Sequence, residues 1–571
     1  MSRISLNILL LSTLVACGGG SSSPQSSPSA SQSSASAPSG GSSSQGSAGV
    51  SDGPARSERI AASKFLQLAT FGATSQEIDD MAEGTVNEWL DHQFNLPVGK
   101  HTPIVNRYLE TYGYDADATP HPGTYRRFAF WERTITSPDQ LRQLVAYALT
   151  QVFVVSDRPT PIFVNPLALS SYSDTLLEHS FGNFRDLLLA VTLHPVMGFY
   201  LSHVNNAKSD PEANTFPDEN YAREVMQLFT IGLYELNLDG SRKLDAEGRP
   251  IATYDNQGIR EFSKVFTGLS YGETSYSPDL VFGKKQPAFN VPMVMFDAFH
   301  ETGEKTLLRG EVLPAGQTGL EDIEGAVDNL FEHPNVGPFI GKLLIQRLVT
   351  SNPSPSYVAR VAQAFNGDGG APRGDMKAVI RAILTDPEAL DAERIREPFR
   401  RYAQIIRALE PVSEDGSYPG LGYLVQFLTG QHVLSAPSVF NFYSPNYSQP
   451  GELDDLGWVS PELQITTEDT IVGITNLVAA TIYQESGLDT PADFPKVTFD
   501  LSHYLSLAED EEALIDAVSI VFTGGQMSDV AQSILQDAVG QIPATDRAGR
   551  VNLALYLTLV APSYAVIGGE T

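Results

Sequence analysis

The sequence predicts a mainly α-helical protein, a large multi-helix globular body with small β-hairpin insertions. From Glu58 onward, most segments carry apolar residues at helical spacing. The strand–helix alternation of a parallel sheet is missing, and no repeat of fixed period occurs. Turn signals with alternating segments are confined to one β-rich insertion near 233–316, within a body that is predicted over 58–571.

The chain opens with a segment that is typical of a lipoprotein signal peptide, predicted over residues 1–17. Arg3 precedes an apolar run, Ile4–Leu14, which is shorter than the roughly 20 residues that span a bilayer. The Leu-Val-Ala-Cys sequence that ends at Cys17 resembles a bacterial lipobox, so we expect lipidation of this cysteine. An ordinary signal peptide with an incidental cysteine is the alternative. Because Gly18 rather than aspartate follows, lipoprotein sorting in a Gram-negative host predicts the outer membrane or cell surface.

A tether is predicted next, over residues 18–57, which are rich in Ser, Gly and Pro and poor in apolar side chains. Such a composition cannot bury enough surface to fold. A disordered chain of this length has an r.m.s. reach of about 35 Å. We therefore expect the folded body to meet the membrane through its lipid anchor only.

Predicted helices then follow one another along the body. ERIAASKFLQLATFG ends at Gly72, and Thr74 or Ser75, with Glu77 nearby, caps the first of two short helices in TSQEIDDMAEGTVNEWLDHQF. DQLRQLVAYALTQVFVVS has the clearest amphipathic pattern, and GNFRDLLLAVTLHPVMGFYLS predicts two helices that meet near Pro195. Later helices are predicted at 320–333, 335–349, 355–366, 374–385, 396–409, 511–522, 526–541 and 546–560.

Two segments predict β structure. LYELNLDGSRKLDAEGRPIATYD has turn signals at Asp239-Gly240 and Glu247-Gly248, which predict a β-hairpin or a small meander. Its acidic residues lack the spacing of an EF-hand calcium loop. EKTLLRGEVLPAG predicts a second hairpin.

Charge and cysteine content exclude several classes of protein. The 571 residues include 68 acidic and 37 basic side chains, for a net charge of -31. Such a field repels phosphate backbones, so we expect no nucleic-acid partner. Cys17 is the only cysteine, which excludes a disulfide within the chain, attached c-type haem, zinc ribbons and iron–sulfur clusters.

Common catalytic motifs are missing from the sequence, among them H-E-x-x-H, G-x-S-x-G and the glycine-rich nucleotide-binding loops. Histidine and carboxylate side chains remain as candidates for metal binding or acid–base chemistry. They are His179, His194, His203, Glu219, Glu224, His300 and Glu301. His194 precedes Pro195, so ending a helix is its alternative role. We assign no metal ligand and leave the cofactor open.

The segment PDENYAREVMQLFTIGLYELN, residues 217–237, predicts nearly four turns of helix. An apolar stripe of Tyr221, Val225, Leu228 and Phe229 would be buried. A polar stripe of Asn220, Arg223, Glu224 and Gln227 lies on another face. This stripe either faces water, locks two helices through paired charges, or lines a site.

Seven segments together carry a resemblance to a known family. They are LQLATFGAT, DQLRQLVAYALTQVFVVS, HSFGNFRDLLLAVTLHPVM, DENYAREVMQLFTIGL, FSKVFTGL, HETGEKTLL and APSVFNFYSPNY. From about Ser63 to the C-terminus the chain resembles the bacterial domain-of-unknown-function 1800 family. The family's N-E-N-Y-A-R-E-L-like block has Asp218 for its first Asn, and its H-D-x-G-x-K-T-like block has Glu301 for Asp.

The resemblance implies an exported protein without an assigned reaction. Family genes often neighbour those of a second family that resembles phosphatases and sulfatases, so an exported partner of that kind is expected. The segments HSFGNFRDLLLAVTLHPVM, DENYAREVMQLFTIGL and HETGEKTLL supply the residues of a predicted shared polar pocket. They are His194, Glu219, Asn220, Arg223, Glu224, His300 and Lys305. Two functions stay open: a binding or accessory lipoprotein of the cell envelope, or a hydrolase, possibly metal-assisted.

Overall fold

A computed structural model describes residues 53–118, 121–273, 282–283, 288–419, 425–483 and 494–568. The predicted signal peptide, Cys17 and the tether up to residue 52 lie outside the described residues. The segment Gly53–Thr571 forms one compact unit. Its described part is mainly helical, as predicted, with strands of only two or three residues. Across these ranges, none of the helices combines the length and the apolar character that crossing a membrane requires.

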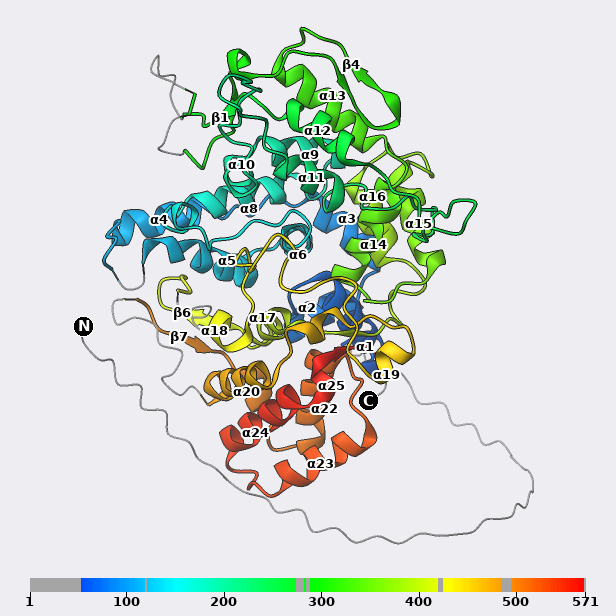
Figure 1. Cartoon of the computed structure of the whole chain (residues 1–571). Helices are drawn as coiled ribbons and strands as arrows, with labels where there is room; N and C mark the ends of the chain where they lie inside the picture. The colour runs from blue at the N-terminus through cyan, green and yellow to red at the C-terminus, as the bar shows by residue number, and fades with distance from the viewer. Residues whose placement is uncertain are drawn as a thin grey trace. The chain divides into compact units, whose positions relative to one another are not determined.

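The first ten α-helices include the six that the sequence predicts in this region, α1 to α3, α6, α9 and α10 (Figure 1). They are α1 Arg56–Ala69, α2 Ser75–Ala82, α3 Val86–Asn95, α4 Thr102–Tyr112, α5 Tyr125–Thr136, α6 Gln140–Thr150, α7 Thr160–Phe163, α8 Ala168–His179, α9 Phe184–Leu193 and α10 Pro195–Tyr200. The predicted break near Pro195 separates α9 from α10, and the predicted cap of α2 is Thr74. Helices α4, α5, α7 and α8 were not predicted.

Helix α6 lies at the centre of this region. It contacts α1, α3, α5, α8 and α14. Every residue of α6 is buried, including the polar Gln140, Arg142 and Gln143. The amphipathic pattern therefore predicted the helix correctly. It did not predict that the polar face would be buried, because neighbouring helices cover that face as well.

Helix α11 is shorter than predicted and covers only Asn220–Gln227. The chain leaves the helix because the amides of Ile231 and Gly232 both donate to the Met226 carbonyl oxygen, at 3.0 Å each. Gly232 also has a left-handed φ of 70°. The segment that follows forms a meander of isolated bridges, with turns at Gly240 and Gly248 as predicted.

The middle of the chain adds α12 to α17 and five short strands. The helices are α12 Asn256–Val265, α13 Gly319–Phe331, α14 Val336–Leu348, α15 Pro355–Asn366, α16 Met376–Leu384 and α17 Pro398–Ala408. The strands are β1 Leu269–Ser270, β2 Val294–Met295, β3 Lys305–Thr306, β4 Val312–Leu313 and β5 Arg394–Ile395. The antiparallel pairing of β3 with β4 confirms the second predicted hairpin.

The C-terminal part completes the fold with α18 to α25. They are α18 Val425–Thr429, α19 Glu452–Asp455, α20 Glu468–Ile482, α21 Ser502–Leu507, α22 Glu511–Thr523, α23 Asp529–Gly540, α24 Arg547–Val560 and α25 Pro562–Ala565. The strands β6 Pro411–Ser413, β7 Val497–Phe499 and β8 Val566–Ile567 form antiparallel pairs β6–β7 and β5–β8. The C-terminal helices pack on the rest of the unit through α22, which contacts α1 and α17.

Candidate functional site

A cavity of about 430 Å³ opens beside α14. This volume lies within the range of small-molecule sites in proteins. Its wall is formed by the segment after α6, the end of α11, the start of the meander, α14 and a loop at 439–446. Most of the wall is apolar, and amide and cationic side chains interrupt it.

Three of the segments that carry the family resemblance meet in this wall. DQLRQLVAYALTQVFVVS supplies Gln151, DENYAREVMQLFTIGL supplies Gln227 and Leu228, and APSVFNFYSPNY supplies Phe440 and Asn441. These segments are far apart in the sequence. The fold therefore assembles the cavity from the family's own motifs.

Positive charge is concentrated in the wall. Arg242, Lys342 and Arg347 line the cavity, and no Asp or Glu stands among the described residues that line it. The Arg242 guanidinium lies over the Tyr234 ring, 4.5 Å from its centroid. Burial, and then repulsion from Arg242, lower the pKa of Lys342. In a chain with a net charge of -31, this local excess of cations is unusual.

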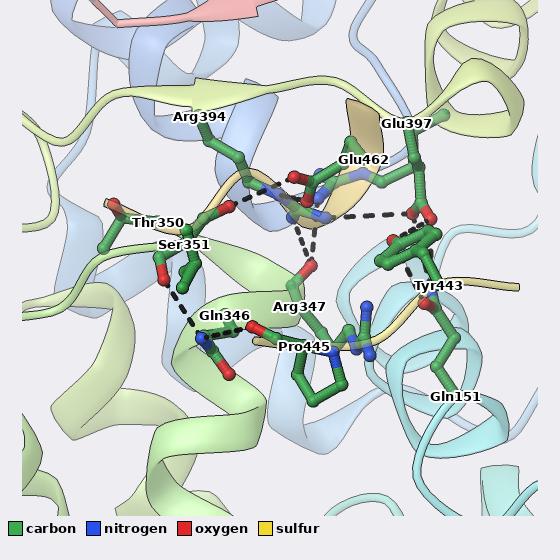
Figure 2. Close-up of polar contacts among 12 residues, drawn as sticks. Gln151, Gln346, Arg347, Thr350, Ser351, Arg394, Glu397, Tyr443, Pro445 and Glu462 are labelled. Carbon is green, nitrogen blue, oxygen red and sulfur yellow. Dashed lines mark hydrogen bonds and ion pairs between the residues drawn. The ribbon is translucent and has the colours of Figure 1, made fainter. Parts of the chain in front are cut away.

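Arg347 is held by the aromatic ring of Tyr443 rather than by a carboxylate. Its guanidinium carbon lies 4.8 Å from the centre of that ring, and the residue is only 4% exposed. The hydroxyl of Tyr443 donates to Glu397 Oε2 at 2.6 Å, and Gln151 Nε2 donates to Glu397 Oε1 at 3.3 Å (Figure 2). Asn441 Nδ2 donates to Gln151 Oε1 at 3.1 Å, which links the loop 439–446 to the end of α6.

A second set of buried contacts fixes the main chain at the end of α14. Arg394 donates to the carbonyl oxygen of Arg347 (Figure 2). Arg400 donates to the same oxygen, at 3.4 Å. The Nε of Arg394 is 3.0 Å from Glu462 Oε1. Gln346 Nε2 donates to the Pro445 carbonyl oxygen at 3.2 Å. These contacts orient α14 and the loop 439–446 toward each other, so the wall that they share is pre-organised.

Asn335 anchors the meander to α14. Its fully buried side-chain amide donates to the carbonyl oxygens of Ile231 and Tyr234, at 2.8 Å each. Its Oδ1 accepts from the amide of Leu236 at 2.9 Å. One asparagine thus positions the segment that brings Tyr234 and Arg242 to the cavity.

The predicted site residues on α11 have different environments. Glu219 and Arg223 form a half-exposed pair at 3.4 Å, and Asn220 is exposed. Glu224 is buried, its Oε2 has no hydrogen-bond partner in the described part of the chain, and burial raises the pKa of its carboxyl group. Gln227, one turn further on, lines the cavity. The residues of the polar stripe therefore have three different environments. Asn220 and Arg223 contact solvent, Glu224 is buried, and the side-chain amide of Gln227 lines the cavity.

His300 and Lys305 do come together, around a buried carboxylate that the sequence did not single out. Asp322 Oδ2 is 2.9 Å from His300 Nε2 and accepts a hydrogen bond from Lys305 Nζ. Lys305 also donates to the carbonyl oxygens of Glu301 and Gly303. All three side chains are almost fully buried, so the cluster joins α13 to β3 and to the loop before this strand.

His194 stands at the junction of α9 and α10, as its alternative role predicts. Its Nδ1 accepts from the amide of Val196 at 3.2 Å, and its ring meets Tyr172 edge to face. Burial lowers the pKa of His194 to about 3. The acceptor role at the start of α10 requires the neutral ring.

None of the seven predicted site residues lines the 430 Å³ cavity in the described structure. Lys342, Arg347 and Asn441 line the cavity but were not predicted from the sequence. The prediction started from histidine and carboxylate side chains, which can bind metals or transfer protons, and these three residues are of other types. The sequence did contain one indication of Asn441, because this residue lies in APSVFNFYSPNY, one of the segments that resemble the family. No functional residue was predicted in that segment. Among the described residues, no group of three or more His, Cys, Asp or Glu side chains is arranged to hold a metal ion.

The fold and the cavity define a class: a mainly α-helical protein that holds a ligand-sized, partly apolar cavity with cationic side chains. A family model described as "Protein of unknown function (DUF1800)" matches residues 64–566. The chain therefore belongs to this family. Comparisons with curated proteins and with solved structures found no match.

Proposed function

We propose that this protein is a binding or accessory lipoprotein of the cell envelope, and that its ligand site is the cavity beside α14. The convergence of three family motifs on one cavity carries the proposal. A pocket of about 430 Å³ with apolar walls and a few fixed polar groups has the properties of a small-molecule site. The contacts around Arg347 and Asn441 support it, because they hold the wall in place without a ligand.

A ligand screen with a cavity-filling variant tests this proposal. Val439 lies in the wall, so Val439→Trp places an indole where a ligand would bind. Val530→Trp makes the same change on the exposed face of α23 and serves as the matched control. We expect compounds that raise the Tm of the wild type and of V530W to leave V439W unchanged. Equal stabilisation of all three proteins would contradict the proposed site.

The location and partner form a second part of the proposal. Cys17, at the end of a lipobox-like run, supports a lipid anchor, and the segment after it supports a tether at the outer membrane or cell surface. An exported phosphatase- or sulfatase-like protein is the proposed partner. We expect Cys17→Ala to move the protein from the membrane fraction to the soluble fraction, with loss of acyl mass from the N-terminal peptide. Membrane association of C17A at the wild-type level would refute the anchor.

The hydrolase alternative is favoured by one observation, the buried carboxyl group of Glu224. Its raised pKa suits a general acid, and it lies one helical turn from the cavity residue Gln227. Any ester hydrolysis by the purified protein should then fall at least about 100-fold in Glu224→Gln. An unchanged rate would exclude this role for Glu224.

A further inference from the structure

We infer that the cavity beside α14 takes a small organic anion, whose charged group binds Lys342 and Arg347 while its apolar part packs against the apolar residues of the wall. This inference rests on the proposed function and names the chemical class of the ligand. Carboxylates, phosphate monoesters and sulfate esters share the required chemistry.

Arg347 provides the first argument. No hydrogen bond or ion pair links its guanidinium to another residue in the described ranges, although the side chain is almost fully buried and lines the cavity. Its Nε is buried without a partner. A buried guanidinium without an acceptor is costly, and the Tyr443 ring offsets only part of this cost. An anion in the cavity would supply the missing acceptor.

Lys342 provides the second argument. It projects from the same helix into the same cavity, and it too makes no hydrogen bond or ion pair with a described residue. Arg242 lines the same cavity, and its positive charge repels that of Lys342. Because no carboxylate stands among the described residues that line the cavity, none of these residues neutralises the two charges. A bound anion would relieve the repulsion and satisfy both cations.

The apolar lining sets the rest of the ligand's chemistry. Leu228, Phe339, Leu343, Val439 and Phe440 form much of the wall. Inorganic phosphate or sulfate alone would leave this surface in contact with water. A short alkyl or aryl group attached to the anion would bury it, at a gain of about 25 cal/mol per Å².

Calorimetric titration with a matched series of probes tests the inference. The probes are hexanoate, hexyl phosphate and hexyl sulfate, with hexanol as the uncharged match and inorganic phosphate and sulfate as the anions without a chain. Lys342→Gln removes one cation and should fold, since Lys342 is only half-buried. Lys377→Gln makes the same change at an exposed lysine on α16, outside the cavity. Arg347→Gln removes the second cation, and its Tm reports whether the fold survives.

We expect at least one hexyl anion to bind the wild type and K377Q equally, and to bind K342Q and R347Q at least about tenfold more weakly. Which hexyl anion binds best identifies the carboxylate, phosphate or sulfate class. If hexanol binds as tightly as the anions, or if K342Q binds anions like the wild type, the inference is wrong while the binding function stands. If no compound binds and V439W is indistinguishable from the wild type, the proposed function itself fails.

Discussion

At the scale of single residues, the cavity depends on side chains that support its wall without belonging to a chemical motif. Asn335 is such a residue, because one amide satisfies two carbonyl oxygens and one amide N–H of the incoming meander. Glu397 is another, since it accepts hydrogen bonds from Tyr443 and Gln431. Burial disfavours the charge of Glu397, but Arg394 and these hydrogen bonds outweigh burial and lower the pKa of its carboxyl group.

Asn335→Ala should destabilise the protein and loosen the cavity. The change removes the partner of one buried backbone group, the carbonyl of Ile231, and of two part-buried groups on Tyr234 and Leu236. A buried polar group without a partner costs about 1–3 kcal/mol, and the part-buried groups cost less because water can reach them. Urea unfolding measures the loss of stability, and ligand titration measures the loss of affinity. Asn237→Ala, in an exposed turn of the same meander, is the control, and stability of N335A equal to this control would contradict the anchoring role.

His194 should make stability depend on pH. Its folded pKa of about 3 lies below the value of about 6.5 in an unfolded chain, so the unfolded state binds the extra proton. Its contribution is complete above pH 6.5 and falls with decreasing pH, by up to about 1.4 kcal/mol per pH unit, until pH 3. His194→Asn keeps an acceptor for the Val196 amide but cannot titrate.

The measurement is urea unfolding of the wild type and H194N at pH 7 and pH 5. We expect the stability difference between the two pH values to be smaller in H194N. His92→Asn, at an exposed position on α3, is the matched control. An H194N profile that parallels the wild type over this interval would show that His194 is not the group responsible.

At the scale of elements, the residues next to a helix end determine where the helix begins, and the same residues can also form contacts with distant helices. Thr74 accepts from the amide of Glu77, and Glu77 accepts from the amide of Thr74, which forms a capping box. Glu77 also forms an ion pair with Arg407 of α17. The cap of α2 was predicted from the sequence, whereas the ion pair that ties α2 to α17 was not.

Thr74→Ala should lower the free energy of unfolding by about 1 kcal/mol, because it leaves an amide of the first turn of α2 without its acceptor. Thr74→Ser keeps the hydroxyl and should retain most of the stability. Chemical denaturation of both variants gives the comparison. Equal loss in the two variants would assign the effect to the methyl group of Thr74 rather than to the cap.

Local hydrogen bonding explains why α11 is shorter than the sequence predicted. Apolar periodicity continues past Gln227, but the helix hydrogen bonds do not, because Met226 accepts from two later amides and Gly232 turns the chain. Apolar periodicity indicates which residues pack against the core, and a turn can do this as well as a helix: Phe229 is fully buried and Leu228 is half-buried. That turn is what places Leu228, Ile231 and Gly232 in the cavity wall.

At the scale of the whole molecule, the folded unit should be independent of the preceding segment. The described core residues lie between Ala62 and Ile567, and Gly53–Thr571 forms its own compact unit. A protein that contains only residues 53–571 should therefore have the same Tm and denaturant midpoint as one that begins at residue 18. A lower Tm of the shorter protein would show that residues 18–52 contribute to the stability of the folded unit.

The sequence alone determined the helical class, most helix positions, the turns of the meander and the family, because these depend on short-range spacing, on turn residues and on local motifs. Only the tertiary structure decided which polar residues share a site. Gln151, Gln227, Lys342 and Asn441 come from four distant segments, and nothing in their local pattern shows that they meet. Their convergence depends on helix packing around the fully buried α6, and such packing is a property of the whole chain.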